Sequence, residues 1–204
     1  LISRAAHLLH DAQHAIVLTG AGISTASGIP DFRSPRTGLW EDVDEMEITS
    51  IQGFLKNPQR FYGWLEPLAL RALRARPNVA HMALAHLERI GKLEAIITQN
   101  IDNLHTAAGS RHVYEIHGHL REMRCTQCGR QYDSSPLFAD FLTNGHLPFC
   151  DCGAILRPSV TLFGEQLPQD VLLAARYHAL HSDLLLVAGS SLTVFPVADF
   201  PAYA

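Results

Sequence analysis

The four cysteines of the chain stand in two close pairs, Cys125 with Cys128 and Cys150 with Cys152. Tetrahedral zinc binds four thiolates, and close cysteine pairs on tight turns are a common way to supply them. We therefore predict one structural zinc ion, because four thiolates leave no open coordination position for catalysis. Two disulfides or a redox-active pair are the alternative use of the same residues.

Two of the 12 histidines, His117 and His119, stand a few residues ahead of the first cysteine pair. A zinc site that already holds four thiolates needs neither of them as a ligand. His117 ends an apolar segment, and an imidazole with a pKa of about 6.5 is suited to take a proton at neutral pH. We expect His119 to be dispensable.

Small or polar residues follow each of four short apolar segments. These residues occupy positions 19–22, 98–102, 117–118 and 189–191. Ligands of an open parallel sheet bind at the carboxyl ends of its strands, so four such ends predict one ligand site. Ordinary strand-to-helix turns are the alternative interpretation.

The first of these ends, GAGISTASG, is similar in part to a dinucleotide-binding loop. Gly20 and Gly22 fit the Gly-x-Gly pattern, whereas Thr25 stands at the third glycine position. Glycines let backbone N–H groups approach a pyrophosphate, and Ser24 adds a hydroxyl donor.

A long loop at 28–40, rich in Gly and Pro, follows this segment. It brings Asp31, Phe32 and Arg33 to the same place. Arg33 is suited to neutralise a phosphate, and Phe32 is suited to cover a ring. A surface loop with Phe32 buried in the core is the alternative.

The secondary structure expected around these residues is a series of strands that alternate with helices. The strands are expected at 15–18, 93–98, 112–117 and 183–188, and the helices at 3–14, 57–75, 79–90 and 169–181. This alternation predicts an α/β fold, a parallel sheet with helices on both faces. The segment 121–157 breaks the alternation and holds all four cysteines, so we predict an inserted module there.

The composition of the 204 residues, 47% hydrophobic and 18% charged, is that of a globular protein with one substantial core. A net charge of −4 argues against a non-specific nucleic-acid binder and is compatible with a basic peptide. No apolar run approaches the roughly 20 residues that span a bilayer, and no signal peptide is evident. We expect a cytoplasmic protein without a membrane partner.

In their order and spacing, several segments resemble the sirtuins, a family of NAD-dependent protein-lysine deacylases. The likeness extends from the first strand to Pro196 and includes the paired cysteines. The matching segments are GAGISTASGIPDFRS, TQNIDNLH, EIHGHL, RPSVTLFGEQLP and GSSLTVFP.

The resemblance implies a Rossmann-like NAD-binding domain at 1–120 and 158–204, and a zinc-binding module at 121–157. NAD and an acyl-lysine peptide would meet in the cleft between them. In such a site, Phe32 would shield the reacting ribose carbon, and Asp102 would hold the nicotinamide carboxamide. The residues expected to bind NAD are Gly20, Ala21, Gly22, Ser24, Asp31, Phe32, Arg33, Gln99, Asn100, Ile101, Asp102, Gly189, Ser190 and Ser191.

The resemblance also implies that His117 and Asn100 are catalytic. His117 would act as the general base that deprotonates a ribose hydroxyl. Nicotinamide would leave, and the acyl group would pass from lysine to ADP-ribose, giving O-acetyl-ADP-ribose from an acetyl-lysine substrate. Gly118 would leave room for the ribose.

The protein or peptide substrate would add as an extended strand between segments 164–166 and 192–194. The Thr161 carbonyl would accept from the lysine N–H. Phe163 and Val194, with His117, would wall an apolar acyl tunnel, and plain core packing is their alternative role. The residues expected to bind substrate are Thr161, Phe163, Gly164, Glu165 and Val194.

Two positions bear on the acyl group. Sirtuins that remove succinyl or malonyl groups carry a Tyr-x-x-Arg pair, and here Tyr62 is followed by Leu65 in place of the arginine. An acyl carboxylate would then be buried without a cation, which is costly. We therefore predict neutral acyl groups, acetyl first.

The family continues past the counterpart of Pro196 with a strand that contacts adenine. An ending at Ala204 would therefore predict weak NAD binding, and a continuation would not. Two other functions remain as alternatives: an ADP-ribosyltransferase or NAD glycohydrolase, and a zinc-bearing scaffold without activity.

Overall fold

A four-stranded parallel sheet, in the order β3-β2-β1-β7, forms the main body of the protein. The computed structural model describes residues 2–32, 34 and 45–204. The strands are β1 (Ala15–Thr19), β2 (Ala95–Thr98), β3 (Val113–Glu115) and β7 (Leu184–Ala188). The α/β fold with a parallel sheet is thus confirmed, and all four predicted strands are present.

Successive residues of β1 face opposite sides of the sheet, and both sides are covered. Ile16 and Leu18 pack on the side of α8 (Gln169–His181) and η2 (Val197–Ala202). Ala15 and Val17 pack with Leu84 of α5 (Val79–Arg89) on the other side. A strand with both faces buried is apolar throughout, which is why the segment reads AIVL without alternation.

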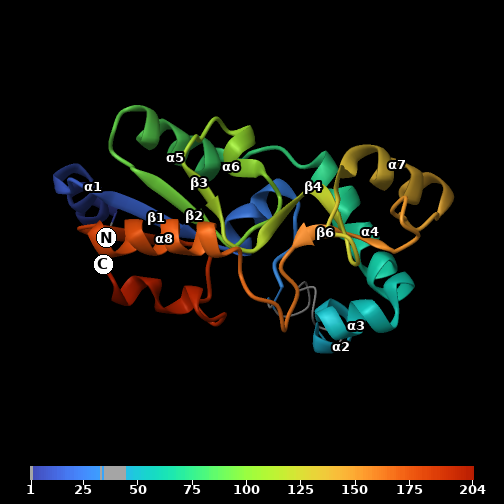
Figure 1. Ribbon diagram of the computed structural model, residues 1–204. Coiled ribbons are helices and arrows are strands. Elements are labelled where there is room, and N and C mark those ends of the chain that lie inside the picture. The colour runs from blue at the N-terminus through green and yellow to red at the C-terminus, as the bar shows by residue number, and fades with distance from the viewer. Residues whose placement is uncertain (1, 33, 35–44) are drawn as a thin grey trace.

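The remaining helices lie mostly at the ends of the sheet and beside the second sheet (Figure 1). One of them, α4, begins at an asparagine cap, since Asn57 accepts from Arg60 N, and Asn78 caps α5 in the same way by accepting from Ala80 N. These helices are η1 (Ala21–Ser27), α1 (Ile2–Asp11), α2 (Glu45–Thr49), α3 (Ile51–Lys56), α4 (Pro58–Arg74), α6 (Leu104–Ala107) and α7 (Ser134–Asn144).

The first helix is shorter than predicted, because α1 ends at Asp11 and not at residue 14. The Asp183 carboxylate accepts the backbone N–H groups of Gln13 and His14 at 2.8 and 2.9 Å. Because these two amides donate to a residue about 170 positions away, they do not continue the helix. Sequence periodicity does not reveal such a distant partner.

A smaller antiparallel sheet, in the order β5-β4-β6, carries the cysteines together with α7. Its strands are β4 (Gly118–Cys125), β5 (Gln131–Asp133) and β6 (Leu156–Val160). Figure 1 shows this sheet beside the main body, with α7 and α4 around it. The predicted module boundaries at 121 and 157 fall within β4 and β6, and they stay a prediction.

The chain passes from one sheet to the other at His117, between β3 and β4. The predicted strand at 112–117 therefore ends two residues early, at Glu115. Gly118 turns the chain with a φ of 77°, and a Cβ there would lie 2.1 Å from the carbonyl oxygen of Ser159. The glycine is thus required by the neighbouring strand, and the space expected for a ribose is filled by Ser159.

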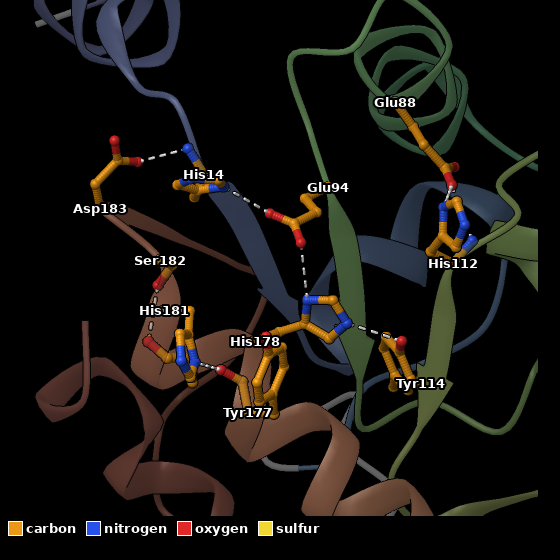
Figure 2. A network of polar contacts seen from close by, with 11 residues as sticks. His14, Glu88, Glu94, His112, Tyr114, Tyr177, His178, His181, Ser182 and Asp183 are labelled. Atoms are coloured by element: carbon orange, nitrogen blue, oxygen red, sulfur yellow. Dashed lines mark hydrogen bonds and ion pairs between the residues drawn. The ribbon is translucent and has the colours of Figure 1, made fainter.

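Several other histidines contribute to a polar network along one side of the main sheet (Figure 2). Glu94 lies between His14 and His178, at 3.2 and 3.4 Å from their Nδ1 atoms. His178 also contacts the Tyr114 hydroxyl at 2.8 Å. These contacts tie α8 to β3 and to the residues just before β1 and β2, so we assign these histidines a structural role.

Candidate functional site

A cavity of about 880 Å³ lies where the carboxyl ends of the parallel strands meet the second sheet. The structure brings together around it every predicted catalytic, NAD-binding and substrate-binding residue except Arg33, which lies outside the described residues. Four separate strand ends therefore form one site, as expected for a parallel sheet.

The glycine-rich segment packs directly against the end of β7. Gly22 N donates to Gly189 O at 2.9 Å, and Gly20 N donates to Ala188 O at 3.2 Å. A Cβ at Gly20 or Gly22 would lie 2.8 or 2.9 Å from Gly189 O. These two N–H groups are used inside the protein, so the glycines serve close packing of two segments as well as ligand approach.

His117 lines the cavity and is held by the strand end beside it. Its Nδ1 lies 3.1 Å from the carbonyl oxygen of Gln99. A carbonyl oxygen only accepts, so Nδ1 carries the proton, and the Nε2 lone pair has no partner among the described residues. Burial lowers the pKa of His117, against the smaller opposing effect of the Gln99 carbonyl. The ring is thus a neutral base at neutral pH.

Asn100 is buried with both hydrogens of its side-chain amide engaged. Its Nδ2 donates to Gly20 O and to Ser24 Oγ, each at 3.1 Å. Ser24 Oγ in turn donates to Asp102 Oδ2 at 2.6 Å, and Asp102 Oδ1 accepts from Leu104 N. The Asn100 carbonyl oxygen is therefore the polar atom of this side chain that is left for a ligand.

A buried pair of histidines lies beneath this network, and the sequence interpretation missed it. His81 and His105 are 0% and 2% exposed, and their ring centroids are 4.8 Å apart. His81 Nε2 lies 3.5 Å from Ser24 Oγ, and His105 Nε2 lies 2.9 Å from Thr19 Oγ1. Burial lowers the pKa of both, that of His105 to about 4. Helical spacing alone gives no sign of this pairing.

Apolar side chains of α4 form one wall of the cavity, and they too were not predicted as a group. They recur at helical spacing, which is the signal that would have found them. They are Phe61, Trp64, Leu65, Leu68 and Ala72. Tyr62 points elsewhere, because its hydroxyl donates to Leu156 O at 2.8 Å in the core.

Polar groups at the other strand ends are arranged in pairs. Gln99 Nε2 donates to Ser190 Oγ at 2.8 Å, which joins the ends of β2 and β7. The hydroxyls of Ser191 and Thr193 lie 2.9 Å apart. Asp31 holds the backbone of its own loop by accepting from Ser34 N at 2.7 Å.

Four of the five predicted substrate residues lie on the segment after β6, and Val194 lies after β7. Thr161 N donates to His117 O at 2.8 Å, and Phe163 exchanges backbone bonds with Thr49 and Ile51. Phe163 and Val194 are half-buried, line the cavity, and are absent from the packed core clusters of the described residues. This position supports the tunnel interpretation over plain core packing.

The four cysteines come together at the far end of the second sheet. All four Sγ atoms lie within 4.8 Å of one another, with Cys125–Cys152 and Cys128–Cys150 separations of 3.5 and 3.6 Å. Zinc–sulfur bonds of about 2.3 Å in a tetrahedron place sulfurs about 3.8 Å apart, so the donor set fits zinc. The four thiols are free, so the disulfide alternative is not supported.

The fold and the cavity define a class: an α/β protein with a nucleotide-sized site between a parallel sheet and a small cysteine-bearing sheet. Residues 20–196 match the model of the Sir2 family, and the chain belongs to that family. No helix within the described residues has the length and apolar character to cross a bilayer.

Related proteins match the sequence over nearly the whole chain. NAD-dependent protein deacylase 2 of Archaeoglobus fulgidus is 47% identical over 98% of this chain and 79% of its own length. The NAD-dependent protein deacetylase of Sulfolobus acidocaldarius is 46% identical over 97% of this chain and 77% of its own.

Solved structures match the fold of the chain as well. A structure described under the mechanism and regulation of Sir2 enzymes has a TM-score of 0.93 at 46% identity, covering 100% of this chain and 81% of that one. A Sir2 variant with a deacetylated p53 peptide and 3′-O-acetyl ADP ribose has a TM-score of 0.93 at 39% identity, covering 99% and 81%.

Proposed function

We propose that the chain is an NAD-dependent protein-lysine deacylase that transfers the acyl group of an acyl-lysine to ADP-ribose. Relatives that match almost the whole chain are NAD-dependent protein deacylases and deacetylases. Related structures hold a p53 peptide with NAD, and a propionylated peptide.

The observation that carries this proposal is the position of His117 in the shared cavity. Its base nitrogen has no partner in the described part of the chain, and its backbone is joined to the predicted peptide segment through Thr161 N. A base, a nucleotide-sized pocket and an apolar wall therefore meet at one place.

The predicted cofactor residues suit NAD by their chemistry. Hydroxyls of Ser190 and Ser191, and the side-chain amides of Gln99 and Asn100, line the cavity with the glycine-rich segment. When bound there, NAD supplies an electrophilic ribose carbon and nicotinamide as the leaving group. We propose that the Asn100 carbonyl and Asp102 orient its nicotinamide end.

The residues of the chain then have separate tasks. We propose that His117 Nε2 removes a proton from a ribose hydroxyl, because it is a neutral base held by the Gln99 carbonyl. The apolar wall of α4 excludes water from the acyl group, and the Thr161 carbonyl, which has no hydrogen-bond partner among the described residues, receives the lysine N–H. Zinc bound by the four cysteines would take no part in these steps, and its role would be to stabilise the second sheet.

Incubation of the chain with an acetyl-lysine peptide and NAD, followed by mass spectrometry, tests the proposal. We expect free lysine, nicotinamide and O-acetyl-ADP-ribose in equal amounts. His117→Ala should lower the rate by at least about 100-fold, the usual contribution of a general base, while His119→Ala serves as the matched control. Nicotinamide release without peptide deacylation would favour an NAD glycohydrolase instead.

The pH dependence of the same assay gives a second check. Burial lowers the pKa of His117, so the ring stays neutral to a lower pH than a free imidazole does. The acid limb of kcat/KM should therefore lie below about pH 6.5, and activity should rise through it with increasing pH.

We also propose a cytoplasmic location. Four free thiols that serve as zinc ligands need a reducing compartment to stay unoxidised. Fractionation of cells that express the chain would test this, and recovery in an oxidising compartment would contradict it.

A further inference from the structure

Arg157 and Glu165 form a bidentate ion pair beside the predicted peptide segment. Arg157 Nη1 donates to Glu165 Oε2 at 2.9 Å, and Nη2 donates to Oε1 at 2.6 Å. The two side chains are only 16% and 20% exposed, so water weakens the pair less than it weakens a surface pair. Paired guanidinium and carboxylate groups in this fork arrangement are strong and geometrically specific.

The same two side chains also hold the backbone between them. Arg157 Nη1 donates to Val160 O at 3.0 Å, and Glu165 Oε2 accepts from Leu162 N at 2.9 Å. Glu165 N closes the turn by donating to Leu162 O at 3.1 Å. Gly164, with a φ of 87°, supplies the left-handed residue of this turn. The ion pair thus fixes residues 160–165 in one shape.

The opposite edge of this segment is left open. Within the part of the chain that the structure describes, neither the Thr161 carbonyl nor the backbone groups of Gly164 form a hydrogen bond. Thr161 N is bound to His117 O, and Phe163 is bound to Thr49 and Ile51. Unpaired backbone groups on a segment held in place are what an added peptide strand requires.

We propose that Arg157 and Glu165 are positioning residues for the acyl-lysine substrate. They hold residues 160–165 so that the open backbone edge receives the peptide strand while Thr161 stays in register with His117. The Glu165 side chain faces Arg157, and it acts on substrate through the segment it holds. This inference rests on the proposed deacylase function.

The Arg157–Glu165 pair and the segment 160–165 that it holds are called the clamp. Peptide affinity should report the loss of this clamp. Glu165→Gln keeps the size of the side chain and removes its charge, and the dissociation constant of an acetyl-lysine peptide should rise about ten-fold. Arg157→Lys keeps the charge but loses the fork, so a smaller rise of about three-fold is expected. The KM for NAD should change less than about two-fold, because the strand ends are untouched.

The matched control is Glu115→Gln, which breaks a second bidentate pair, with Arg121, away from the cavity lining. It should leave peptide affinity unchanged. The double exchange Arg157→Glu with Glu165→Arg restores the pair in reverse and should recover part of the affinity.

The outcomes separate this inference from the proposed function. The measurement is fluorescence anisotropy of a labelled acetyl-lysine peptide, with melting temperatures recorded in parallel. A native chain that binds the peptide while Glu165→Gln binds equally well would overturn the clamp alone. A native chain that shows no peptide binding would overturn the proposed function, and the clamp with it. Equal weakening of peptide binding and NAD binding in the variants would show that Arg157 and Glu165 have a merely structural role.

Discussion

At the scale of single residues, the site depends on which atoms are already engaged inside the protein. His117 has its Nδ1 held by Gln99 O, and Asn100 has both amide hydrogens directed to Gly20 and Ser24. These internal bonds fix which atom faces a ligand: Nε2 of the histidine and the carbonyl oxygen of the asparagine. Residue type alone leaves that choice open, because both side chains have several polar atoms.

Leu65 tests the predicted preference for neutral acyl groups. Its side chain is 1% exposed and lines the cavity from α4. Leu65→Arg should lower deacetylation about ten-fold or more, because a cation enters an apolar wall, and should create measurable desuccinylation. Rates with acetyl- and succinyl-lysine peptides check this. Leu55→Arg, at an exposed position, is the control, and no gain of desuccinylation would place the acyl group elsewhere.

Gly189 tests the packing of the glycine-rich segment. Its φ is 66°, and a Cβ there would lie 2.1 Å from Ile23 N. Gly189→Ala should lower the unfolding free energy by about 3 kcal/mol and weaken NAD binding, since strain and a backbone clash add. Gly91→Ala, with a φ of 72° and open space around it, isolates the strain and should cost about 1 kcal/mol. Urea denaturation of both variants would show whether the difference exists.

At the scale of elements, two sheets with different sources of stability meet at His117. The parallel sheet is buried on both faces by helices. The second sheet has a three-residue strand, β5, and is tied at its far end by the four cysteines. Its other end packs in the buried cluster around α4, so the end that holds the cysteines is the part that depends on this tie.

Zinc removal should therefore unfold one sheet and spare the other. After treatment with a strong chelator, amide hydrogens of β4, β5 and β6 should lose protection in hydrogen exchange, while those of β1 and β2 keep it. Deacylation should fall as well, because Thr161 and His117 are joined across the two sheets. Restoration of both by added zinc is the control. Uniform loss of protection in both sheets would contradict this division.

At the scale of the whole molecule, the cavity lies between the hydrophobic clusters of the main body and the cluster around α4 and the second sheet. A polar network beneath it connects Thr19, Thr98 and His105 in the interior. Thr19 donates its hydroxyl hydrogen to Thr98, so it accepts from His105 Nε2–H, and His105 Nδ1 is buried without a partner among the described residues. The folded protein therefore holds this ring neutral.

Acid should weaken the folded state through His105. Burial and the neighbouring His81 lower its pKa to about 4, so between pH 6.5 and 4 the unfolded chain binds a proton that the folded chain does not. Stability from this group is complete above about pH 6.5 and falls by about 2 kcal/mol by pH 5. Urea denaturation at pH 7 and pH 5, with zinc in excess, measures the change.

His105→Gln should reduce this pH dependence, whereas His7→Gln, at an exposed position of α1, should leave it unchanged. An unaltered pH dependence in His105→Gln would assign the acid sensitivity to other groups.

Local sequence is enough to predict the secondary-structure elements and the residues at their ends. Apolar strands followed by small polar residues, capped helices and two cysteine pairs depend on neighbours within a few positions, so spacing predicts them. The family followed from the same segments. Which of these ends touch depends on the folded arrangement, because contacts such as Gly22 with Gly189, or Asp183 with His14, span more than 160 positions. The end of α1, the pair of His81 and His105, and the fork of Arg157 and Glu165 depend on sheet order and close packing. Local sequence does not encode those distances, because many arrangements of the same elements satisfy its pattern.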